Sequence, residues 1–213
     1  FTRTSLYILS IFTCEAHKSR LRKMEESWIP EVMPDGMSLQ YVYGNSEEPV
    51  EDGRNLYLPC EESYEYLLDK TYHTLKYLSD KDFEYWIKLD NDIFIPDFEK
   101  FTDKILEISR QGFDCATASF VRYNDYLSRT WHYEKVADIY KIPYLGDYPD
   151  RWMGGYCYII NKKFCKIALE QLEKTKQHKL PVTQAFEDIV ISNILFSNGA
   201  KCCEMGDLVI HNH

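Results

Sequence analysis

The chain has 213 residues, a length that fits one domain, or one domain with an insertion. It carries 34 acidic and 25 basic residues, a net charge of −9, and an acidic protein does not attract phosphate backbones over distance, so nucleic-acid binding is disfavoured. No apolar run approaches the roughly 18 residues of a membrane-spanning helix, so we expect no membrane insertion by this segment.

The first half of the chain alternates expected strands and helices. Hydrophobic runs predict strands, and apolar residues at three- and four-residue spacing predict helices. The expected elements are a strand over 6–12, a helix over 17–28, a strand over 38–43 with a polar loop through Arg54, a helix over 61–78 and a strand over 85–89. This alternation predicts an α/β fold with a mixed, mainly parallel sheet flanked by helices and a site at the carboxyl ends of its strands.

The second half is less regular. A segment rich in Tyr, Asp and Pro is expected to be a long loop with some helix, and loops of that length are usually functional. The expected elements are a strand over 115–121, this loop over 122–151, a strand over 156–160, helices over 162–174 and 187–196, and a strand over 208–210.

Seven cysteines are present, so at least one cannot pair within the chain. Cys202 and Cys203 are adjacent and no C-x-x-C pair occurs, which argues against a thiolate metal site. We therefore expect free, buried thiols in a reducing compartment and a cytoplasmic location.

The sharpest chemical signal is Asp90-Asn91-Asp92, directly after an apolar strand. Two carboxylates one residue apart at a strand end can reach one cation, and oxygen ligands suit Mg²⁺ or Mn²⁺. Such an ion bridges the phosphates of a nucleotide sugar and stabilises charge on the leaving diphosphate. A solvated acidic turn has the same D-x-D pattern.

Other candidates carry weaker signals. His211 and His213 follow the last strand and could complete a mixed oxygen and nitrogen site for Mn²⁺, although an exposed His pair is equally ordinary. Glu187 and Asp188 lie at the start of an expected helix, where acidic residues interact favourably with the helix dipole and cap the helix. Either carboxylate could instead deprotonate an acceptor hydroxyl. The paired Gly154 and Gly155 permit close backbone approach to a ligand or form a plain turn.

Six segments, in this order, resemble motifs of the GT-A glycosyltransferases of the fringe and β-1,3-galactosyltransferase type. They are residues 13–28, 62–71, 88–95, 148–156, 187–189 and 210–213. The family's three-aspartate motif is here only Asp-Asn-Asp, and its membrane anchor and disulfide pattern are missing. A compact version of this kind also resembles the sugar-transferring domain of large algal-virus enzymes that build capsid glycans.

The resemblance implies a GT-A fold and transfer of a sugar from a UDP-sugar to a hydroxyl of a glycan or glycoprotein, a viral capsid glycoprotein among them. It implies one domain over 1–213, with a nucleotide-binding half over 1–95 and an acceptor-binding half over 96–213. The resemblance implies that Mn²⁺ or Mg²⁺ is bound by Asp92 and His213, with Asp90 in support and His211 as the alternative histidine. It implies that Asp188 is the catalytic base. It implies that the donor is bound by Thr13, Arg20, Lys70, Asp90, Asn91, Gly154 and Gly155.

Two other functions use the same residues differently. A glycoside hydrolase needs two carboxylates flanking one bond, roughly 5 to 9 Å apart. Glu187 and Asp188 point apart on a helix, so the pair would have to include Asp90 or Asp92. A non-catalytic nucleotide-sugar binding module would bind its ligand through the D-x-D, and mutation of Asp188 would change nothing measurable.

Overall fold

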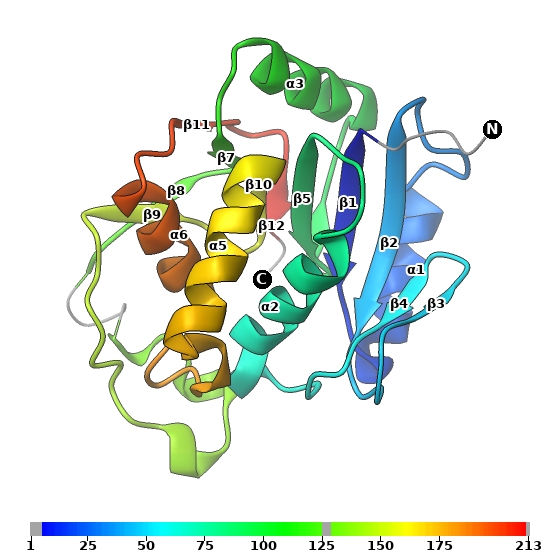
Figure 1. The fold of residues 1–213 in the computed structure, drawn as a ribbon. Coiled ribbons are helices and arrows are strands. Elements are labelled where there is room, and N and C mark those ends of the chain that lie inside the picture. The colour runs from blue at the N-terminus through cyan, green and yellow to red at the C-terminus, as the bar shows by residue number, and fades with distance from the viewer. Residues whose placement is uncertain (1–5, 125–128, 212–213) are drawn as a thin grey trace.

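The computed structural model describes residues 6–124 and 129–211 (Figure 1). Its centre is an eight-stranded sheet with the strand order β11-β7-β10-β5-β1-β2-β4-β3. β3 and β10 run against the other strands, so the expected α/β class with a mixed, mainly parallel sheet is confirmed. The strands are β1 (Tyr7–Phe12), β2 (Met37–Tyr43), β3 (Val50–Asp52), β4 (Asn55–Tyr57), β5 (Tyr85–Asp90), β7 (Cys115–Thr117), β10 (Cys157–Asn161) and β11 (Cys202–Glu204).

Helices cover both faces of this sheet (Figure 1). α1 (Lys18–Ser27) and α3 (Phe98–Arg110) pack on one face, and α2 (Leu67–Leu78), α5 (Lys162–Thr175) and α6 (Glu187–Ser197) pack on the other. Because both faces are covered, every residue of β1 is buried, which explains its continuous apolar sequence. α6 is apolar nearly all round because it lies deep in the packing, and it carries Glu187 and Asp188 at its start.

Two short sheets complete the fold. β6 (Ile93–Phe94) pairs with β12 (Ile210–His211), which returns the end of the described chain to the segment after the D-x-D. β8 (Phe120–Arg122) pairs with β9 (Arg151–Met153), which closes the long loop. The described residues of that loop contain helical residues at 129 and 130 and two 3₁₀ turns, η3 (Tyr133–Lys135) and η4 (Asp138–Tyr140), so the expected long loop with some helix is confirmed there.

Several expected boundaries were wrong. The polar loop before Arg54 contains a β3–β4 hairpin, because Gly53 adopts a positive φ of 60° at the turn and Leu56 is buried. The helix expected over 61–78 begins at Leu67, after a 3₁₀ turn over Tyr64–Tyr66.

The remaining errors concern short or unexpected elements. The strand expected over 115–121 is divided between β7 in the central sheet and β8 in a small one. The strand expected over 208–210 is only the two-residue β12. Helix α3 and strand β11 were not expected, although Asp97 caps α3 by accepting a hydrogen bond from the Lys100 amide at 3.0 Å. No helix among the described residues is long and apolar enough to cross a membrane.

Candidate active site

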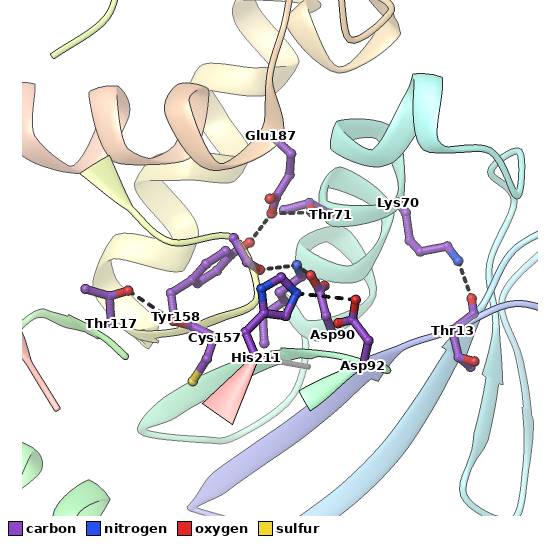
Figure 2. Close-up of polar contacts among 12 residues, drawn as sticks. Thr13, Lys70, Thr71, Asp90, Asp92, Thr117, Cys157, Tyr158, Glu187 and His211 are labelled. Atoms are coloured by element: carbon purple, nitrogen blue, oxygen red, sulfur yellow. Dashed lines mark hydrogen bonds and ion pairs between the residues drawn. The ribbon is translucent and has the colours of Figure 1, made fainter. Parts of the chain in front are cut away.

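The candidate residues meet at the carboxyl ends of β1 and β5 (Figure 2). These parallel strands pair Phe12 with Asp90, so Thr13 and the D-x-D lie at the same edge. β10 runs the other way and pairs Cys157 with Leu89, which places the preceding Gly154 and Gly155 there too. One sheet edge therefore collects side chains from three distant parts of the sequence.

Asp90 is oriented by a buried lysine. Lys88 is fully buried, and its Nζ lies 2.5 Å from Asp90 Oδ1 and also donates to the Gly155 carbonyl. Burial disfavours the ammonium, but the charges of Asp90 and Glu187 more than offset this and raise the pKa of Lys88 to about 12. Lys88 is therefore a permanent positive charge beneath the site.

Asp92 faces His211. Its Oδ2 lies 3.3 Å from His211 Nε2, because the β6–β12 pairing places His211 beside Ile93 (Figure 2). The imidazole stacks on the Tyr156 ring, with centroids 4.8 Å apart and planes 2° apart. Burial raises the pKa of Asp92, but His211 and Arg20 lower it by more, so Asp92 is ionised at neutral pH.

A metal ion would find part of its coordination shell here. No group of three His, Cys, Asp or Glu side chains in the described part of the chain is arranged to hold a metal by itself. Asp92 Oδ1, however, is buried without a hydrogen-bond partner among those residues, and His211 supplies a nitrogen beside the other oxygen. Such oxygen and nitrogen ligands fit Mn²⁺, which would take the rest of its coordination shell from other ligands. His213 lies outside the described residues, and its role remains a prediction.

Three predicted donor-binding residues form one structural cluster. The Lys70 ammonium donates to the Thr13 carbonyl at 2.7 Å (Figure 2). The Asn91 amide donates to Thr13 Oγ1 at 3.1 Å. Lys70 and Asn91 are buried, and Asn91 also lies 3.3 Å from His17 Nδ1. The three side chains thus fix the end of β1 against β5 and α2, and their contact with a donor remains a prediction.

Arg20 lies on α1 and is exposed. Its positive charge acts on both His17 and Asp92 and lowers the pKa of each. Arg20 therefore faces the D-x-D side of the molecule, where an anionic ligand would be attracted.

Glu187 and Asp188 have different environments. Glu187 is buried and accepts hydrogen bonds from Thr71 Oγ1 at 3.0 Å and from the Tyr158 hydroxyl (Figure 2). Asp188 Oδ1 accepts from the Ile189 amide at 2.9 Å, so it also helps to cap α6. Burial and the neighbouring Glu187 raise the pKa of Asp188 to about 7, against the opposing charge of Lys88. A carboxyl group with that pKa is suited to proton transfer at neutral pH.

Gly155 allows the chain to pass close to Asp188. A Cβ atom at Gly155 would lie 3.3 Å from Asp188 Oδ2, and one at Gly154 would lie 3.1 Å from the Ser119 carbonyl. Gly155 therefore packs closely against the Asp188 carboxylate, and Gly154 packs closely against the Ser119 carbonyl. A role in lining a donor-sugar pocket stays a prediction.

Sequence reasoning missed Lys88, Tyr158 and Thr71, which orient the carboxylates. Lys88 had a detectable signal, because a lysine in a strand buried on both faces must find a charged partner. The contacts of Tyr158 and Thr71 with Glu187 join residues 29 and 116 positions apart, and no local pattern predicts them.

Comparisons with known proteins give a fold neighbour only. No family model matches the chain, and no curated protein matches it. Among solved structures, the mannosyltransferase PcManGT from Pyrobaculum calidifontis, in complex with GDP-Man and Mn²⁺, is similar with a TM-score of 0.48 at 12% identity. The alignment covers 97% of this chain and 56% of that one, so the chain spans about half the length of this neighbour. The likeness concerns the fold.

Proposed function

We propose that the chain is a metal-dependent glycosyltransferase that moves a sugar from a UDP-sugar to an acceptor hydroxyl on a glycan or glycoprotein. The observation that carries the proposal is the pairing, at one sheet edge, of an ionised Asp92 beside His211 with an Asp188 whose pKa is about 7. Asp92 and His211 suit a cation and its diphosphate, and the Asp188 carboxylate suits a base.

Asp92 and His211 would hold Mn²⁺ or Mg²⁺, with Asp90 in support. When bound, the ion would neutralise the charge that develops on the departing diphosphate. Lys88 fixes Asp90 and the Gly155 carbonyl and so maintains the shape of this edge.

Asp188 would remove the proton from the acceptor hydroxyl as its oxygen bonds to the sugar's anomeric carbon. The bond between that carbon and the diphosphate oxygen breaks at the same time, and the bonding electrons leave with the nucleoside diphosphate. Its raised pKa allows Asp188 to take the proton near neutral pH. Attack from the face opposite the diphosphate would invert the anomeric centre.

The environment of Glu187 excludes this residue from the carboxylate pair of a hydrolase, so a hydrolase would have to pair Asp188 with Asp90 or Asp92. One oxygen of its carboxylate already accepts from Thr71 and Tyr158, and the side chain is buried. It therefore does not combine with Asp188 into a pair of carboxylates that flank a glycosidic bond.

The proposal includes a cytoplasmic setting and a division of labour within one domain. All seven cysteines are free, which supports a reducing compartment. Residues 1–95 would bind the nucleotide, and residues 96–213 would bind the acceptor.

A turnover screen tests the proposal. The protein would be incubated with Mn²⁺ and a panel of UDP-sugars and GDP-sugars, and the released nucleoside diphosphate would be measured with and without chelator. We expect metal-dependent release from at least one UDP-sugar, its loss in Asp188→Asn, and no change in Asp103→Asn, which alters an exposed carboxylate on α3. Release of sugar from glycosides without any nucleotide would instead support the hydrolase, and metal-dependent binding without turnover would support the binding module.

A further inference from the structure

The long loop brings a lysine to the candidate site. Lys135 ends the 3₁₀ turn η3, and its ammonium lies 5.1 Å from the centre of the Tyr64 ring and 4.5 Å from that of Trp131. Loss of solvent around the ammonium lowers the pKa of Lys135, and the charges of Asp90, Asp92 and Asp188 counteract this. Tyr64 packs against the hydrophobic cluster that contains Phe186 and Ile189, the residues on either side of Glu187 and Asp188, so the ammonium lies near the proposed base. The charges of Asp90 and Asp92 reach it as well.

The loop around Lys135 is anchored. The His132 ring is buried, lies 5.2 Å from the Phe186 ring at the start of α6, and its Nε2 contacts the Ile142 carbonyl at 2.8 Å. The Ala137 amide donates to Glu65 Oε1 at 3.1 Å, which ties the loop to the turn before α2. The loop is therefore anchored on both sides of Lys135, at His132 and at Ala137.

Lys135 makes no ion pair with any carboxylate of the described residues, although three of them act on its charge. Other lysines of the chain do form such pairs. Lys141 on the same loop contacts Asp138 at 2.7 Å, and Lys88 contacts Asp90 at 2.5 Å. A cation that is influenced by three carboxylates but forms an ion pair with none of them suits a ligand that carries its own negative charge together with a metal ion.

We infer that Lys135 binds the diphosphate of the nucleotide donor, together with the ion proposed at Asp92. A cation held there by two aromatic rings contacts phosphate oxygens that the D-x-D cannot approach without a metal. The inference rests on the proposed function, because it assigns a residue to the same donor site.

The test is an NMR titration of UDP and of uridine in the presence of Mg²⁺, with wild type, Lys135→Met, Lys135→Arg and Lys141→Met. Both Met variants remove one positive charge from the same loop, so they change the net charge of the protein equally. We expect Lys135→Met to weaken UDP binding about tenfold while uridine binding is unchanged, as for the loss of a charged hydrogen bond. Lys135→Arg should retain most of the affinity, and Lys141→Met should bind UDP as wild type does.

The inference fails if Lys135→Met binds UDP as tightly as wild type, or if it loses UDP and uridine affinity equally, which would indicate a rearranged loop. If wild type itself binds no UDP, the proposed UDP-sugar function fails first, and the two failures are thereby distinguished.

Discussion

A Cβ atom placed on Gly155 would lie 3.3 Å from both the Cβ atom and the Oδ2 atom of Asp188. That distance is tighter than ordinary van der Waals contact, so a side chain at position 155 must displace either the carboxylate or the backbone that carries the Gly155 carbonyl. The same carbonyl accepts a hydrogen bond from Lys88, so the backbone has little freedom to move.

Gly155→Ala should therefore reduce turnover while sparing the fold. A displacement of a few tenths of an ångström at the base is expected to lower kcat about tenfold, because rate depends steeply on the position of a reacting group. Steady-state kinetics and UDP calorimetry would separate the two effects, since we expect UDP affinity within about twofold of wild type. An Ala variant with full kcat would show that the Asp188 position is not critical.

Lys88→Met should destabilise the protein strongly. Lys88 is fully buried, and its partner Asp90 is 31% exposed, so loss of the ammonium leaves a partly solvated charge uncompensated and costs up to about 3 kcal/mol. Urea unfolding measures this loss, and Lys88→Met with Asp90→Asn should recover part of it. Lys100→Met, which breaks an exposed pair with Asp97, is the control and should leave the free energy of unfolding unchanged. A Lys88→Met protein as stable as the control would contradict the assigned role.

The rate of transfer should depend on the ionisation of Asp188. Because its pKa in the free protein is about 7, the base is protonated at pH 5.5 and ionised at pH 8.5, so kcat/KM should rise through about pH 7 and then level off. A pH profile of kcat/KM at constant Mg²⁺ measures this, because kcat/KM reports the ionisation of the free enzyme. A flat profile between those limits would exclude Asp188 as the base.

The same carboxylate should reduce stability at neutral pH. The folded pKa of Asp188, about 7, lies above its ordinary value of 3.8, so the folded protein binds this proton more tightly than the unfolded chain. The stabilisation that comes from this tightly bound proton is complete below about pH 4, and it is lost as the pH rises through about 7. Asp188→Asn should therefore have a higher Tm than wild type at pH 8 and a similar Tm at pH 4. Equal melting temperatures at pH 8 would show that Asp188 is not desolvated.

The parts of the fold that could be predicted are those with a continuous physical signal. β1 and β5 are covered on both faces, so their sequences are continuous apolar runs. The apolar residues of α2 recur at three- and four-residue spacing, and α6 begins with two acidic residues. The position of the D-x-D followed from the end of β5. Helix α3 was also predictable, because Asp97 caps it and Phe101, Ile105 and Ile108 form its apolar face.

The remaining features depend on contacts between distant segments. β6 and β12 have two residues each, too few for any periodicity, yet their pairing brings His211 to Asp92. The placement of Lys135 depends on how residues 129–151 pack against the 3₁₀ turn over Tyr64–Tyr66 and against α6. A loop of that length has no periodic pattern from which this packing could be derived.

Asp92 carries the central claim that this edge binds a divalent ion and the diphosphate bridged to it. Isothermal titration calorimetry of UDP, with Mn²⁺ and with chelator, tests the claim with wild type, Asp92→Ala and the control Asp103→Asn. The account predicts that wild type and Asp103→Asn bind UDP only when Mn²⁺ is present, and that Asp92→Ala loses this metal-dependent binding. Binding of UDP by Asp92→Ala with unchanged affinity and unchanged dependence on Mn²⁺ would contradict it.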